Sequence, residues 1–216
     1  FANEDNQVQL PLNIRTDLPT NTVYTSHPFM PSSSWQKTLG QNYPTPTMLF
    51  IAPVHDWAGK TVAFFAFEID PDKIFNPAFH ENQVGQTGQA YAIDEHGRML
   101  TQSKFTKQLI QAGLIDAAHP LSELALEVRD PGVNLLSSEK KPVAANAPLT
   151  LMAKSLTQHQ TGVSLKGYRD YRGVKVIGSW RWDDHLNMGI VTETEVAEVY
   201  KLYRSLLFSV VISIVF

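Results

Sequence analysis

The sequence predicts an α+β fold in which antiparallel sheets are flanked by short helices. Three observations support this class: apolar runs come in pairs, short turns rich in Gly and Asp join the members of a pair, and short helical segments separate the pairs. A parallel sheet would need long crossover connections between its strands. Two sheet units are expected, with the division near His80.

The first unit is expected to contain a hairpin. The apolar runs from Met48 to Val54 and from Thr61 to Glu68 flank Asp56-Trp57-Ala58-Gly59, a turn with Gly at a position that favours positive φ. The second run shows no polar alternation, which predicts a strand covered on both faces. The preceding residues 1–47 contain six prolines and are predicted to form loops and short strands that wrap other structure.

The second unit repeats this pattern after a helix that is expected to start at Asp70 and Pro71, as N-cap and first helical residue. The expected strands are Gln89 to Asp94, Met99 to Ser103, Gly162 to Tyr171, Val174 to Trp182 and Met188 to Thr192. The expected helices are Lys104 to Ala112, Leu149 to Gln158 and Glu193 to Leu207. Turns are predicted at residues 95–98 and 172–173, whereas Leu121 to Val128 fits either a strand or a helix.

The composition excludes several classes of protein. A hydrophobic content of 43% and a formal net charge of −3 are not those of a disordered chain. The mild acidity argues against a nucleic-acid partner, since nucleic-acid-binding domains are usually strongly basic. Cysteine is absent, which removes disulfides, thiolate metal sites and cysteine nucleophiles.

The chain closes on an uncharged apolar run from Leu206 to Phe216, preceded by Lys201, Tyr203 and Arg204. A membrane-spanning helix needs roughly 18 or more apolar residues, so this run is too short by itself. Basic and aromatic residues at its start are typical of a membrane interface. We therefore expect the truncated start of a transmembrane helix, and the alternative is a buried C-terminal helix.

Motifs that could carry chemistry are weak. Asp183-Asp184-His185 falls between two strands, where a solvated turn is the simpler interpretation than a metal site. Residues 85–88, Gly-Gln-Thr-Gly, lead into a strand, whereas a phosphate-binding loop must open a helix. No Gly-x-Ser-x-Gly nucleophile elbow is present. No catalytic residue, metal ligand or cofactor is predicted.

The aromatic segment from Gly167 to Trp182 is unusual. On alternating strands, Tyr168, Asp170 and Arg172 share one face, and the opposite face takes Arg169 and Tyr171. Trp180 and Trp182 point together, away from Arg181. This arrangement suits either a small-molecule pocket with aromatic walls or cross-strand packing under arginine stems.

The stretch from Gly85 to Phe105, GQTGQAYAIDEHGRMLTQSKF, resembles a signature of double Cache sensor domains. Residues 129–132, 148–150 and 167–182 look like later blocks of that family, and residues 48–71 look like an earlier one, in colinear order from about Thr45 to Tyr200. Gln89, Thr101 and Lys104 depart from the pattern, in place of Glu, Ser and Arg.

The resemblance implies a PAS-like, non-enzymatic sensor domain in the periplasm, part of a receptor in the bacterial inner membrane. It implies a partial membrane-distal Cache module at residues 1–80, a complete membrane-proximal module at 81–200, and the start of a transmembrane helix at 201–216. The expected partners are a small-molecule ligand (an amino acid, amine or organic acid), the membrane and a second copy in a homodimer. A kinase, cyclase or chemoreceptor output would lie beyond the chain.

The predicted ligand-binding residues are Tyr91, Ser103, Arg129, Asp130, Tyr168, Asp170, Trp180 and Trp182. Two alternatives from other classes stay open. One is a structural or dimerisation module of a membrane protein that binds no ligand. The other is a secreted enzyme, which would require a convergent catalytic constellation that the sequence does not display.

Overall fold

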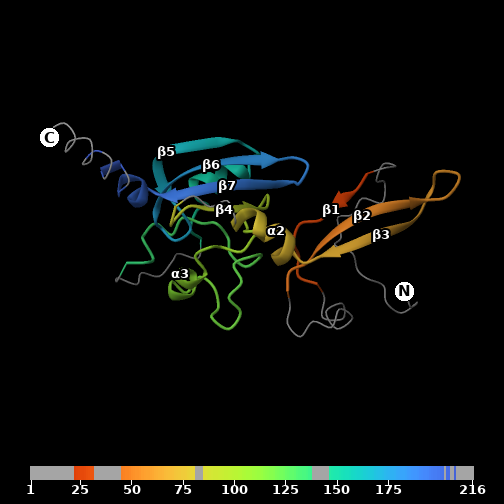
Figure 1. Cartoon of the computed structure of the whole chain (residues 1–216), viewed down its shortest axis with the longest axis horizontal. Coiled ribbons are helices and arrows are strands. Elements are labelled where there is room, and N and C mark those ends of the chain that lie inside the picture. Colours follow the sequence, from red (N-terminus) through yellow and green to blue (C-terminus); the bar gives the residue numbers. More distant parts are fainter. Residues whose placement is uncertain are drawn as a thin grey trace. The chain divides into compact units, whose positions relative to one another are not determined.

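The computed structural model describes residues 22–31, 45–80, 85–137, 146–201, 203, 204 and 207. The chain divides into two compact units, Phe1–Pro71 and Asp72–Phe216. Both units contain antiparallel sheet, and helices accompany the larger sheet (Figure 1). The α+β class with antiparallel sheets is therefore confirmed. The module boundaries expected from the Cache resemblance stay a prediction.

The sheet of the first unit contains β1 (Tyr24–Thr25), β2 (Met48–His55) and β3 (Thr61–Ile69), in the order β1-β2-β3. The predicted hairpin is present, and β2 pairs with β3 antiparallel from Met48↔Ile69 to His55↔Thr61. Asp56 closes the turn because its Oδ1 accepts bonds of 2.9 Å from the backbone N–H groups of Ala58 and Lys60.

The prediction that β3 is covered on both faces is wrong. Val62, Phe65 and Phe67 are exposed to 59%, 64% and 59%. An apolar run without alternation indicates that a strand can be covered twice, but coverage needs a second and a third layer. The described part of this unit forms one sheet, and four apolar residues of the strand pair are buried: Met48, Leu49, Ile51 and Ile69.

The sheet of the second unit has the order β4-β7-β6-β5, all antiparallel. Its strands are β4 (Gln89–Ile93), β5 (Gly162–Arg169), β6 (Lys175–Asp183) and β7 (Met188–Glu195), and its helices are α2 (Pro71–His80), α3 (Thr106–Gln111) and α4 (Leu151–Leu156). The first strand therefore pairs with the last one, at Gln89↔Glu193 for example. This long-range pairing brings the two ends of the unit together.

The core of the second unit lies against one face of this sheet. Met152 and Leu156 of α4 are fully buried, and Trp180 and Trp182 of β6 belong to the same apolar cluster. Thr150 caps α4, since its hydroxyl accepts a bond from the Ala153 N–H. Burying each such large side chain contributes about 1.5–3 kcal/mol to folding. The core thus holds α4 on the sheet and buries the tryptophan face of β6.

Several predicted elements are confirmed. α2 begins at Pro71, α3 and α4 lie within the predicted helices, and β4, β5 and β6 lie close to their predicted bounds. The turn at residues 172–173 is present, with the Asp170 N–H bonded to the Val174 carbonyl.

Two predicted segments differ from the structure. Met99 to Ser103 is not a regular strand, because Met99 forms only an isolated bridge to Ile93. Leu121 to Val128 is neither strand nor helix beyond a bridge between Arg98 and Glu127. Hydrophobic periodicity predicts which side chains are buried in these segments. It does not predict whether the backbone hydrogen bonds continue beyond a single bridge to form a regular strand.

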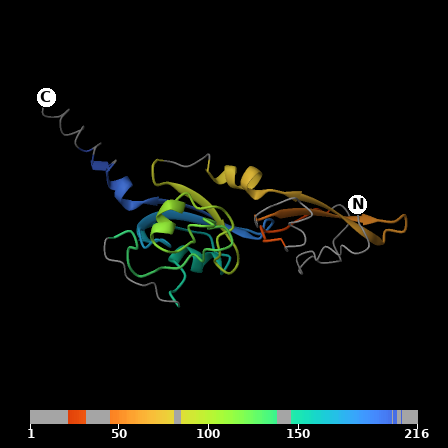
Figure 2. The same cartoon turned by 90° about the horizontal axis from the view of Figure 1, so that it is seen from below.

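The predicted helix from Glu193 begins three residues late. Glu193, Thr194 and Glu195 belong to β7, and the C-terminal helix starts at residue 196. β7 lies between β4 and β6, so ladder bonds to both neighbours outweigh the helix preference of two glutamates. Both views show the helix projecting from the end of β7 (Figure 1, Figure 2).

Most of the apolar run from Leu206 to Phe216 lies outside the described residues. Among the residues that are described, no helix is long and apolar enough to cross a membrane.

Candidate functional site

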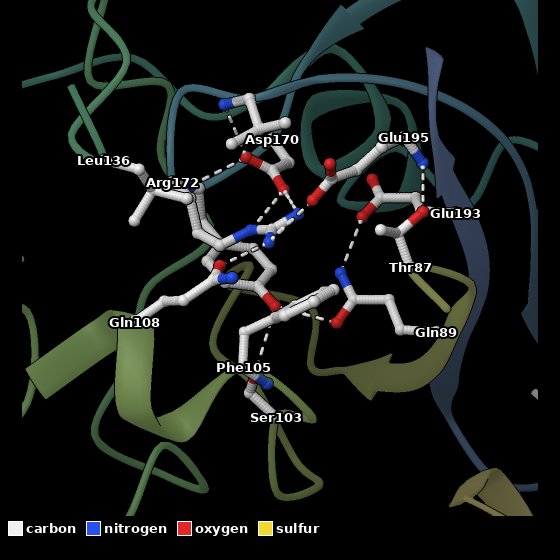
Figure 3. A network of polar contacts seen from close by, with 12 residues as sticks. Thr87, Gln89, Ser103, Phe105, Gln108, Leu136, Asp170, Arg172, Glu193 and Glu195 are labelled. Atoms are coloured by element: carbon white, nitrogen blue, oxygen red, sulfur yellow. Dashed lines mark hydrogen bonds and ion pairs between the residues drawn. The ribbon is translucent and has the colours of Figure 1, made fainter. Parts of the chain in front are cut away.

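A buried polar network occupies the second unit where β4, β5 and β7 meet the turn at 170–173 and the start of α3 (Figure 3). Its charged members are Asp170, Arg172 and Glu193, all buried, together with the half-buried Glu195. Strand alternation explains part of this gathering, because Glu193 and Glu195 point to the same face of β7. The sheet brings residues more than a hundred positions apart into contact.

Glu193 accepts hydrogen bonds from three side chains of two neighbouring segments. The Tyr168 hydroxyl donates to Oε1 at 2.6 Å. The Tyr91 hydroxyl and the Gln89 amide both donate to Oε2, at 3.0 and 3.2 Å. The carboxyl group is thus held by three neutral donors.

Burial and the negative charge of Asp170 raise the pKa of Glu193 to about 7, although the bonds from Tyr168, Tyr91 and Gln89 oppose this shift. Burial and the charge of Glu193 also raise the pKa of Tyr91 and Tyr168 well above the ordinary value. Both hydroxyls therefore keep their protons and act as donors. The carboxyl group changes charge near neutral pH.

Arg172 is the cation of the network and is fully buried. Its Nε donates to Asp170 Oδ2 at 2.8 Å, and Nη2 lies 2.7 Å from the same oxygen, an ion-pair contact rather than an aligned hydrogen bond. Nη1 donates to the Gln108 side-chain oxygen at 2.6 Å and lies 3.1 Å from Glu195 Oε1. The guanidinium carbon sits 3.5 Å from the centroid of the Phe105 ring, a cation–π contact.

Tyr171 and Gln89 connect the Glu193 carboxyl group to Ser103, which precedes α3. The Tyr171 hydroxyl donates to Gln89 Oε1 at 2.9 Å and lies 2.9 Å from Ser103 Oγ. Gln89 in turn donates to Glu193, so a continuous chain of hydrogen bonds runs from Ser103 to the carboxyl group. Such a chain makes the positions of its members interdependent.

The structure brings four of the eight predicted residues into this network: Tyr91, Ser103, Tyr168 and Asp170. The expected alternation holds for Tyr168 and Arg169 but is wrong for Tyr171. β5 ends at Arg169, and the tight turn that follows carries Tyr171 inward, to 2% exposure.

The two tryptophans lie on the buried face of β6, and Arg181 between them is exposed, as predicted. Trp180 packs edge-on against Tyr168 and donates to Ser155 Oγ at 2.9 Å. Trp182 stacks on His159, with ring centroids 4.0 Å apart, and its Nε1 has no hydrogen-bond acceptor among the described residues. Trp180 therefore lies beside the network through its contact with Tyr168.

Arg129 and Asp130 lie apart from the network. Arg129 donates to the Ala147 carbonyl at 2.7 Å and pairs with the exposed Glu127. Asp130 accepts a bond of 2.8 Å from Arg169. The contacts of Arg129 join loop residues, the contact of Asp130 ties its loop to β5, and both residues stay partly accessible to solvent.

The polar residues of the network that are not among the eight predicted residues are Gln89, Gln108, Tyr171, Arg172, Glu193 and Glu195. A signal for the two glutamates exists: the run Thr192-Glu193-Thr194-Glu195 alternates with period two, as a strand does. The same run also fits the start of a helix, which is the element that the sequence predicts from Glu193.

The polar groups of the network bind one another, and this constrains its chemistry. Among the described residues, no group of three or more His, Asp or Glu side chains is placed to hold a metal ion. The arrangement offers a buried carboxyl group near neutrality beside aromatic hydroxyls and a fixed guanidinium. Such a set can recognise a polar ligand or respond to its own protonation.

No family model matches the chain, and no curated protein matches it. Solved structures with similar folds include the extracellular domain of the putative histidine kinase mmHK1S-Z3 (TM-score 0.48, 12% identity, 86% of this chain and 53% of that one). The periplasmic sensory domain of the Campylobacter jejuni chemoreceptor Tlp1 gives a TM-score of 0.48 at 13% identity, covering 84% and 52%.

A third similar structure is the ligand-binding domain of the Pseudomonas aeruginosa PAO1 amino acid chemoreceptor PctB in complex with L-Arg (TM-score 0.49, 12% identity, 91% and 66%). The chain spans about half the length of the first two structures. At this level of similarity they assign neither a ligand nor a family.

Proposed function

We propose that the chain is the periplasmic sensor part of a bacterial transmembrane receptor that binds a small molecule and signals through its C-terminal helix. The double Cache resemblance of residues 45–200 supports this proposal. The chain then belongs to a larger protein whose output is a kinase, a cyclase or a chemoreceptor domain. The segment itself performs no catalysis in this proposal.

The observation that carries the proposal is the path of β7. This strand contributes Glu193 and Glu195 to the buried network and continues without a loop into the helix at residue 196. A rearrangement of the network therefore moves β7, and β7 moves the helix. The apolar run from Leu206 follows that helix in the sequence and is the proposed start of the membrane segment.

The proposed ligand is an amino acid, an amine or an organic acid. Of the eight predicted residues, Tyr91, Ser103, Tyr168 and Asp170 are the ones whose hydrogen bonds it would replace. The tryptophans would supply apolar walls, and Arg129 and Asp130 would act from the surface. Because the network groups are already paired, a ligand must match the bonds that it displaces, which favours a compound with both polar and charged groups.

A thermal-shift screen of the purified chain against amino acids, amines and organic acids tests this proposal. A compound present at 100 times its Kd raises the free energy of unfolding by about 2.7 kcal/mol, which gives a measurable increase in Tm. Tyr168→Phe should weaken that increase, and Arg129→Gln measures what the surface residue contributes. If no compound in these three classes raises Tm, the ligand-binding proposal for this chain fails.

The second candidate is a structural or dimerisation module without a ligand. The pairing of Arg172 with Asp170, Glu195 and Gln108 favours it, because the buried cation already has its partners within the chain. Sedimentation of the chain over a range of concentrations tests the proposed homodimer. A stable dimer together with a silent ligand screen supports this candidate against the sensor.

Coupling to the membrane is tested in the intact receptor. A Gly-Gly insertion after Tyr203 interrupts the C-terminal helix between the sheet and the apolar run. We expect ligand binding to persist and signalling output to disappear. Full output after the insertion would exclude transmission through this helix.

A further inference from the structure

The turn that precedes β4 holds the carboxylate of Glu198, which lies in the first turn of the C-terminal helix. The backbone N–H of Gln86 donates to Oε1 at 2.8 Å, and the N–H of Thr87 donates to Oε2 at 2.7 Å. The Thr87 hydroxyl also donates to Oε2. Both oxygens of one carboxylate are therefore bound by a single turn, 111 residues away in the sequence from Glu198 in the case of Thr87.

Gly85 makes room for this carboxylate. It has a φ of +71°, and a Cβ at this position would overlap Glu198 Oε1. The glycine-containing turn at 85–88 leads into a strand and not into a helix, and for this reason no phosphate site is predicted there. Its amides bind an anion nonetheless, and that anion is a side chain of the same chain.

Thr87 links the helix to the end of β7 as well. Its hydroxyl oxygen accepts a bond of 3.2 Å from the Glu195 N–H, and the Glu195 carboxylate lies 3.1 Å from Arg172 Nη1. Glu195, the last residue of β7, is thus anchored to the buried Arg172, and the first turn of the helix is anchored through Glu198 to the turn that precedes β4. Two residues, Val196 and Ala197, lie between the anchored Glu195 at the end of β7 and the anchored Glu198 in the helix.

The two anchors differ in their access to water. Arg172 is fully buried, so its bond to Glu195 persists with the fold. Glu198 reaches solvent, and the bonds from the Thr87 hydroxyl and then from the Gln86 and Thr87 amides hold its pKa below the ordinary value. A carboxylate bound at the surface can exchange these donors for water at small cost, whereas a buried one cannot.

We propose that Glu198 and the turn at Gly85–Thr87 form a releasable latch, which sets the direction of the C-terminal helix relative to the sheet. With the latch closed, the helix continues from β7 in the orientation seen here. With the latch open, the helix pivots at residues 196–197 while Glu195 stays on Arg172. The latch itself is a property of the fold, and only its use in signalling rests on the proposed function.

Hydrogen–deuterium exchange on the full chain tests the latch. Glu198→Gln keeps the length of the side chain and removes its charge, and Thr87→Val removes the hydroxyl while leaving both amides. In Glu198→Gln we expect amide exchange to accelerate about tenfold in residues 85–88 and in residues 196–201, with β6 unchanged. Thr87→Val should accelerate the same two segments to a smaller extent.

Glu95→Gln is the matched control, since Glu95 is an exposed carboxylate in another turn of the same unit. It should leave both segments as in the wild type. Unchanged exchange in Glu198→Gln overturns the latch. Faster exchange in residues 85–88 alone also overturns it, because Glu198 would then cap the turn without holding the helix.

Faster exchange in β6 as well would show that Glu198 supports the whole unit, and this too overturns the latch. The measurement needs no ligand. If no compound raises Tm in the thermal-shift screen, the sensor proposal is excluded and the latch is not affected. If exchange is unchanged in Glu198→Gln, only the latch is excluded.

Discussion

The hydroxyl of Tyr168 on β5 donates a hydrogen bond of 2.6 Å to Glu193 Oε1 on β7, across the intervening strand β6. Both side chains are buried, and Tyr168 donates to Oε1, whereas Tyr91 and Gln89 donate to Oε2. The two ends of the sheet are therefore connected through one carboxyl group. Its protonation and its donors decide how tightly β5 and β7 are held together.

The stability of the second unit should depend on pH through Glu193. Its pKa is about 7 in the folded chain and 4.5 in the reference state, so the folded chain binds more protons between these values. The free energy of unfolding then decreases as pH rises from about 4.5 to about 7, by on the order of 3 kcal/mol from this group. The decrease levels off about one pH unit above the folded-state pKa, and the contribution is constant beyond that.

Glu193→Gln isolates this contribution. Gln cannot ionise, so the stability of the variant relative to the wild type should increase between pH 5 and pH 8. Urea denaturation at both pH values measures the difference. A variant whose relative stability is the same at pH 5 and pH 8 would show that Glu193 does not titrate in this range.

Tyr168→Phe should destabilise the chain more than Tyr91→Phe. The first change removes the hydrogen bond that Glu193 Oε1 accepts from Tyr168, whereas after the second change Gln89 still donates to Oε2. An unsatisfied buried acceptor costs about 1–3 kcal/mol, and more for a charged one. Tyr168→Phe should also raise the pKa of Glu193 further, because the bond from Tyr168 lowers it.

Urea denaturation of both tyrosine variants at pH 8, which lies above the pKa of Glu193 in the wild type, gives the comparison. Equal losses of stability would mean that the two carboxyl oxygens are not distinguished by their donors.

Arg172→Met should be strongly destabilising, while Arg169→Met should not. Removing Arg172 leaves the fully buried carboxylate of Asp170 without a cation, at a cost of about 3–5 kcal/mol. Arg169 pairs with Asp130 at a surface site, where its side chain is 49% exposed, and such pairs contribute about 0–1 kcal/mol. The same substitution is made at two arginines three positions apart in the sequence, so the two variants differ only in the surroundings of the removed guanidinium.

Thermal denaturation of the two arginine variants measures this contrast. A loss in Arg169→Met as large as that in Arg172→Met would contradict the assignment of Arg172 as the central cation.

Gly173→Ala should cost several kcal/mol, and Gly113→Ala about 1 kcal/mol. Both glycines have positive φ, +76° and +72°. A Cβ on Gly173 would overlap the carbonyl oxygen of Val133, whereas one on Gly113 meets nothing within 4 Å. Because the backbone strain is similar in both variants, the difference between their losses in the free energy of unfolding measures the cost of the steric overlap at Gly173.

The midpoints of urea denaturation for these two variants provide the test. Similar midpoints would mean that the 133–134 backbone moves aside at little cost.

Local signals in the sequence predict much of this fold correctly. The β2–β3 hairpin follows from two apolar runs around Asp56, the helix start at Pro71 follows from the geometry of proline, and the inward direction of Trp180 and Trp182 follows from strand alternation. Each depends on interactions between residues that are close in the sequence, at most 21 positions apart in the hairpin (Met48↔Ile69). These are the interactions that residue type and spacing report.

The candidate site is predictable only in part. Tyr168 and Asp170 are found from the aromatic segment, but Glu193 is missed because its run fits a helix as well as a strand. The choice is made by β4 and β6, which lie on either side of β7 and supply its ladder. The local pattern does not reveal the pairing with β4, since β4 precedes Glu193 by about a hundred residues.

By itself, the sequence determined the class of fold, the main turns and the buried face of β6, because backbone preferences and side-chain alternation act locally. Only the tertiary structure decided that β3 is exposed, that Tyr171 turns inward and that Glu193, Arg172 and Glu198 each meet their partners. The physical reason is the same in each case. Burial and charge pairing depend on which distant segments pack together, and no residue pattern encodes that packing alone.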